Sequence, residues 1–111
     1  NTGQIINTSS VLGTKVRANA GAYSATKYAV EALSEAMRLE LADTNVKVTC
    51  IEPGLVMTDL HDHFEVHPKD VIGLEKPLQP VDIARIVLHV ATQPDHVLIP
   101  KVMVLPKHNA I

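Results

Sequence analysis

The chain has 111 residues, 46% of them hydrophobic, which suffices for one compact domain but not for two. Its formal net charge of −2 excludes the basic surface of a nucleic-acid-binding protein. No apolar stretch reaches the ~20 residues of a membrane helix, and the lone cysteine, Cys50, excludes an internal disulfide framework. We therefore expect a cytoplasmic protein that binds neither nucleic acid nor membrane.

The first half of the chain predicts a strand, a helix and a second strand. The segment GQIINTSS (3–10) is an apolar run that ends in small hydroxyl residues, as a strand entering a loop does. Residues 23–41 place apolar side chains at helical spacing, beside a stripe of four alanines, while Glu31, Glu35 and Arg38 mark a wetter side. The segment VKVTCIE (46–52) is rich in β-branched residues and stops at Pro53-Gly54, which predicts a strand. Within this strand we expect Cys50 to be a buried structural thiol rather than a nucleophile.

The second half predicts a loop, a helix and a last strand. Residues 59–79 show no periodicity and mix acidic residues, histidines and prolines, which is typical of a loop or a lid. After Pro80, apolar residues recur at helical spacing and Asp82 occupies the first turn, which predicts a helix. Residues 96–105 indicate a last strand, in which Pro100 favours a sheet edge or a bulge.

This order of elements predicts an α/β fold. Strands that alternate with helices imply right-handed βαβ units and a parallel sheet with both faces covered. Ligands in such sheets bind beyond the carboxyl ends of the strands. The segments NTSS (7–10) and EPGLVMT (52–58) follow the first two predicted strands at that position, so we expect the functional chemistry there.

The stretch YSATK (23–27) sets a phenol and an ammonium four positions apart. On a helix, Tyr23 and Lys27 share one face, roughly 6 Å apart along the axis. A nearby ammonium favours the phenolate form of a tyrosine, which makes Tyr23 a candidate acid/base and Lys27 its tuner. Alone, this spacing also fits the first turns of an ordinary amphipathic helix.

Two neighbouring motifs favour an acid/base role of Tyr23 over an ordinary amphipathic helix. Ser10 precedes Tyr23 by 13 positions at the end of a predicted strand, and Pro53-Gly54 is followed by Val56 and Thr58. With these elements in this order, GQIINTSSVLG, AYSATKYAVEALSEAMRLEL and VKVTCIEPGLVMTDL resemble the second half of the short-chain dehydrogenase/reductase family. The resemblance is close from about Gly3 to Leu60 and looser beyond. It implies the C-terminal half of a doubly wound, Rossmann-type parallel sheet.

The resemblance also implies a role for each matching residue. Tyr23 would be the general acid that protonates a carbonyl oxygen, or the base in the reverse direction. Lys27 would tune Tyr23 and bind the nicotinamide ribose, and Ser10 would hold the substrate oxygen. The cofactor would be bound by Tyr23, Lys27, Pro53, Gly54, Val56 and Thr58, with the Val56 backbone and the Thr58 hydroxyl at its carboxamide. The general look of the last strand favours NADP over NAD, although the residues that choose between them in the family belong to a strand that this sequence lacks.

Some elements of the family pattern are missing. The Gly-rich phosphate-binding turn, the N-A-G element and the active-site asparagine of the family are absent, and all of them would precede Asn1. We therefore expect residues 1–111 to be one partial dinucleotide-binding domain, its catalytic half, and the 111-residue piece alone to be inactive. The first strand would then have an exposed edge.

Other residues admit more ordinary roles. Ser9 stands beside Ser10 and can simply end the strand. His61, His63 and His67, together with nearby carboxylates, are ligand types of a zinc or iron site, but they lack the rigid spacing of one. We expect no metal, and a cover over the substrate in this region, as the family has.

The function expected is therefore hydride transfer between NADP or NAD and a small alcohol, ketone or aldehyde, in a homodimer or homotetramer formed through the 23–41 helix. One alternative is a non-catalytic fragment or assembly module, which the missing dinucleotide turn favours. A family member converted to a binding protein is another, and the intact Ser10, Tyr23 and Lys27 argue against it.

Overall fold

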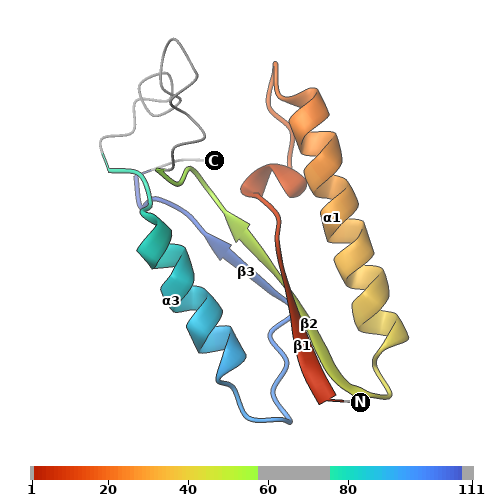
Figure 1. Cartoon of the computed structure of the whole chain (residues 1–111). Coiled ribbons are helices and arrows are strands. Elements are labelled where there is room, and N and C mark those ends of the chain that lie inside the picture. Colours follow the sequence, from red (N-terminus) through yellow and green to blue (C-terminus); the bar gives the residue numbers. More distant parts are fainter. Residues whose placement is uncertain (1, 58–75, 109–111) are drawn as a thin grey trace.

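The computed structural model describes residues 2–57 and 76–108. In chain order, its elements are strand β1 (Thr2–Thr8), the short 3-10 helix η1 (Val11–Gly13), helix α1 (Gly21–Glu40), strand β2 (Asn45–Pro53), helix α3 (Pro80–Ala91) and strand β3 (Lys101–Val104). The predicted order of strands and helices is confirmed. Figure 1 shows the strands side by side between two helices.

The sheet is parallel, with the order β1-β2-β3. Residues Thr2–Thr8 pair in register with Asn45–Ile51, and Cys50–Pro53 pair with Lys101–Val104. The central strand β2 is buried without interruption from Val48 to Pro53, as expected for a strand covered on both faces. The buried apolar core is built around this strand and consists of Val11, Val48, Cys50, Ile51 and Val90.

Helices α1 and α3 cover opposite faces of the sheet (Figure 1). On one face, Asn7 donates to Ser34 of α1 over 2.9 Å. On the other, Gln4 donates to the carbonyl of Ala91, the last residue of α3, over 3.0 Å. Both crossovers step in the same direction across the sheet but over opposite faces, so they must have opposite hands. The prediction that both units are right-handed is therefore wrong for one of them.

Local sequence accounts for the ends of the helices. Asn19, which has a positive φ of 66°, reverses the chain just before α1; asparagine tolerates this left-handed conformation. Helix α3 begins at Pro80, whose missing N–H costs nothing at a first helical position. The Gln79 N–H donates to Asp82 Oδ2 over 2.8 Å, so the first-turn role predicted for Asp82 is confirmed.

The last strand is shorter than predicted. Strand β3 covers only Lys101–Val104 of the expected 96–105, and Pro100 stands just before it. The Pro100 carbonyl accepts from the Cys50 N–H over 2.9 Å, so the proline joins the ladder only as an acceptor. Among the strands described, β3 lies at one edge and β1 at the other, which agrees with the edge positions expected for Pro100 and for the first strand.

Candidate active site

The carboxyl end of β1 leads into two buried serines. The Ser9 N–H donates to the Ile51 carbonyl over 2.7 Å and so extends the pairing with β2. Ser10 caps η1, because its Oγ accepts from the Leu12 N–H over 3.1 Å. The Ser9 hydroxyl is directed to the Lys27 carbonyl at 3.4 Å, which is a structural use of that side chain. Ser10 still has its own O–H as a donor.

Tyr23 and Lys27 lie on one face of the first turns of α1, as the spacing predicts. The Lys27 ammonium lies over the Tyr23 ring, 5.6 Å from its centroid, within cation–π range. Tyr23 is 49% exposed, so its phenol is open to a ligand. Its neighbour Ser24 is fully buried and is directed to the Lys15 carbonyl at 3.4 Å, which anchors this end of the helix.

Gly13 sets the distance between η1 and α1. A Cβ at this position would lie 2.6 Å from Ser9 Oγ, 3.0 Å from Glu31 Cγ and 3.1 Å from the Lys27 carbonyl oxygen. Only a glycine fits these contacts without displacement, because real Cβ atoms do not approach this closely. The sequence reasoning missed Gly13. Its place three residues after Ser10 was the available signal, but two of the three atoms that crowd it, Glu31 Cγ and the Lys27 carbonyl oxygen, belong to α1.

The turn after β2 begins at the same edge of the sheet. Pro53 is the buried last residue of β2, and the Gly54 N–H donates to the Val104 carbonyl over 2.7 Å. A Cβ on Gly54 would approach Pro106 Cδ to 3.0 Å, so the turn packs closely against the segment after β3. Pro53 comes two residues after Ile51, whose carbonyl accepts from the Ser9 N–H, so this turn and the two serines follow the same ends of β1 and β2.

Val56 forms an isolated parallel bridge with Leu78. In this bridge the Leu78 N–H donates to the Leu55 carbonyl over 3.0 Å, and the Met57 N–H donates to the Leu78 carbonyl over 2.8 Å. The bonds therefore belong to the neighbours of Val56, and its own N–H and C=O point to the opposite side. Thr58, the other predicted carboxamide contact, lies outside the described residues.

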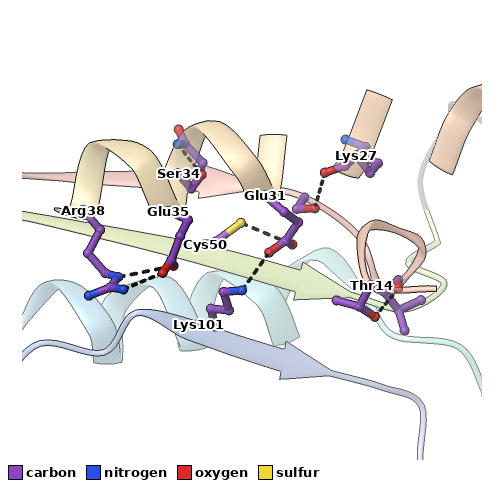
Figure 2. Close-up of polar contacts among 11 residues, drawn as sticks. Thr14, Lys27, Glu31, Ser34, Glu35, Arg38, Cys50 and Lys101 are labelled. Atoms are coloured by element: carbon purple, nitrogen blue, oxygen red, sulfur yellow. Dashed lines mark hydrogen bonds and ion pairs between the residues drawn. The ribbon is translucent and has the colours of Figure 1, made fainter. Parts of the chain in front are cut away.

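Polar side chains also fill the interface between α1 and the sheet (Figure 2). The Cys50 thiol is fully buried, and burial raises its pKa to about 11. The predicted burial of Cys50 is therefore confirmed, and a thiol that stays protonated is a poor nucleophile. Glu31 and Glu52 are buried in the same region. The sequence reasoning assigned Glu31 to the wet side of the helix, and that assignment is wrong.

Neither a metal centre nor a membrane helix is found in the described parts of the chain. Residues 2–57 and 76–108 contain no group of three or more potential metal-ligating side chains. In the same residues, no helix is both long enough and apolar enough to cross a membrane. The histidines that resemble a ligand set, His61, His63 and His67, lie outside the described residues.

The model of the short chain dehydrogenase family matches residues 1–68, which include every candidate site residue. The chain belongs to the short-chain dehydrogenase/reductase family. An uncharacterized oxidoreductase of Staphylococcus aureus (strain USA300) is 41% identical over 104 residues, covering 94% of this chain and 42% of that protein. Dehydrogenase/reductase SDR family member 11 of Mus musculus is 40% identical over 114 residues, covering 94% and 43%.

Solved structures show the same fold. A serine dehydrogenase in its closed form, complexed with NADP+, matches with a TM-score of 0.83 at 32% identity, over 93% of this chain and 44% of that one. Serine dehydrogenase from Escherichia coli matches with a TM-score of 0.74 at 35% identity, over 93% and 39%. The predicted Rossmann-type α/β fold is confirmed. The chain spans less than half the length of these relatives.

Proposed function

We propose that this chain is the catalytic part of an NAD(P)-dependent oxidoreductase that transfers a hydride between the nicotinamide and a small alcohol/carbonyl pair. The observation that carries the proposal is the exposed Tyr23 phenol with the Lys27 ammonium over its ring, 5.6 Å from the centroid. This pair lies on the helix that packs against η1, which follows the carboxyl end of β1, and ligands in such sheets bind beyond the carboxyl ends of the strands.

Tyr23, Lys27 and Ser10 each have a separate role in the proposed reaction. In reduction, Tyr23 donates its phenolic proton to the carbonyl oxygen, and in oxidation its phenolate accepts the proton of the alcohol. The Lys27 charge stabilises the phenolate that remains, which keeps the proton available. Ser10 donates its O–H to the same substrate oxygen, so that oxygen is fixed while its charge changes.

The cofactor supplies the hydride, and the turn after β2 would hold its nicotinamide end. Pro53 and Gly54 shape that turn. The N–H and C=O of Val56 are not used in its bridge to Leu78 and point to the opposite side. An amide donor and acceptor side by side match a carboxamide. Thr58 would add its hydroxyl, and Lys27 would bind the ribose. NADP is favoured over NAD, and a serine dehydrogenase of similar structure binds NADP+.

The same proposal includes assembly and location. Helix α1 exposes Tyr28, Leu33 and Leu39 at 42%, 64% and 59%, and a second copy of the chain would pack on this helix in a dimer or tetramer. The unpaired Cys50 thiol fits the reducing cytoplasm. The substrate is a small alcohol, ketone or aldehyde.

The test is a panel of aldehydes and ketones assayed with NADPH and with NADH, using the full-length protein and its Tyr23→Phe variant. The proposal expects turnover that depends on Tyr23 for at least one substrate. The alternative is a non-catalytic fragment or assembly module. Turnover that is absent, or that Tyr23→Phe leaves unchanged, would favour the module.

A further inference from the structure

The inner face of α1 meets the sheet through a buried polar cluster. Glu31 and Glu52 are only 8% and 3% exposed, and Cys50, on the same strand as Glu52, is 1% exposed. The Cys50 thiol donates to Glu31 Oε2 over 3.4 Å, and Lys101 Nζ lies 3.7 Å from Glu31 Oε1 (Figure 2). Two carboxyl groups at this depth are costly unless their charges and lone pairs are satisfied.

If both carboxyl groups of this cluster are ionised, the cluster has too few hydrogen-bond donors for their oxygens. Among the residues described, Glu31 Oε1 and Glu52 Oε2 are buried without a hydrogen-bond partner. Two carboxylates cannot satisfy each other, because neither carries a hydrogen. The groups that face Glu52 are Glu31 from α1, Cys50 from its own strand and Lys101 from β3. Lys101 is half exposed and supplies one positive charge for two carboxyl groups.

We propose that Glu31 and Glu52 hold one proton between them near neutral pH, and that this shared proton fastens α1 to the end of β2. The protonated carboxyl then donates to the ionised one, so that only one of the two buried carboxyl groups carries a negative charge. Burial, then the hydrogen bond and charge of Glu31, raise the pKa of Glu52 to about 7, while Lys101 acts in the opposite sense. The proton belongs to the pair rather than to one residue.

The pair connects two parts of the candidate active site, which makes Glu31 and Glu52 positioning residues. On α1, Glu31 lies one turn after Lys27, which lies one turn after Tyr23. Glu52 directly precedes Pro53 and the turn that would hold the nicotinamide. Loss of the proton would leave two negative charges between the catalytic helix and that turn. The effect on turnover rests on the proposed function, whereas the shared proton does not.

Infrared spectroscopy of the chain tests the proton directly. Surface carboxyl groups are ionised at about pH 6, so a protonated-carboxyl C=O band at that pH, lost by about pH 9, is the expected result. The band should be absent in Glu52→Gln and present in Glu35→Gln, whose glutamate is paired with Arg38 on the same helix at 2.6 Å. A wild-type spectrum without the band overturns the proposal, even if Glu52→Gln does not fold.

Cys50, the only cysteine of the chain, reports whether the proton fastens the helix. Its reaction with the disulfide reagent DTNB requires α1 and β2 to separate, because the thiol is buried between them. Removing the Glu52 charge would by itself ease thiol ionisation and speed the reaction. If the pair fastens α1, Glu52→Gln instead reacts about tenfold more slowly than wild type at about pH 8.5, since its amide still donates to Glu31. An equal or faster reaction overturns the fastening role, and Glu35→Gln should match wild type.

Discussion

Replacing Gly13 with alanine should separate η1 from α1 and destabilise the chain. The added Cβ would lie 2.6 Å from Ser9 Oγ, 3.0 Å from Glu31 Cγ and 3.1 Å from the Lys27 carbonyl oxygen. The Ser9 side chain is buried, and the Lys27 oxygen belongs to the helix backbone, so neither can simply turn aside. Overpacking of this kind costs about 1–3 kcal/mol in free energy of unfolding.

Gly21 provides a matched control for the same substitution. It is the first residue of α1, and a Cβ there would have no heavy atom within 4 Å. Alanine at that position should be neutral or stabilising by up to roughly 1 kcal/mol, because glycine disfavours the helix. Urea unfolding of the two variants and the wild type measures both effects. A Gly13→Ala chain as stable as Gly21→Ala would refute the steric argument.

The other predictions concern the proposed reaction, the cofactor and pH. In the full-length protein, Tyr23→Phe should lower turnover on the order of 10²–10⁴-fold with unchanged thermal stability, because it removes the positioned acid; steady-state rates and a melting curve check this. Lys27→Met should reduce turnover and cofactor affinity together, because the same ammonium faces the Tyr23 ring and would bind the ribose; steady-state rates and calorimetry check this, and an unchanged cofactor affinity would deny Lys27 the ribose contact. Calorimetry of the 111-residue chain should show no low-micromolar affinity for NADPH, since no Gly-rich turn is present to bind the pyrophosphate. Because the pKa of Glu52 rises from 4.5 to about 7 on folding, its contribution to stability is complete below pH 4.5 and is lost as the pH rises to about 7. Urea unfolding across that range should show a loss of up to roughly 3 kcal/mol that Glu52→Gln abolishes.

The sequence alone determined those features that depend on local geometry. The spacing of Tyr23 and Lys27 was enough to place them on one face, because an α-helix fixes the direction of residues four apart. The strand–helix alternation similarly implied a parallel sheet, since a helix-length connection lets consecutive strands run the same way. The position of Ser10 and Pro53 at the carboxyl ends of their strands followed from that order.

Only the tertiary structure decided which distant residues meet and on which side. That α1 and α3 cover opposite faces depends on contacts such as Gln4 with Ala91, which no periodicity encodes. Glu31 looked like a solvent-facing residue from its polarity, yet it is buried against Cys50 because η1 and β2 close over that turn of the helix. Gly13 is required both by the Ser9 side chain and by a helix that begins eight residues later. These features depend on shape and charge shared between separate elements, so they exist only once the chain has folded.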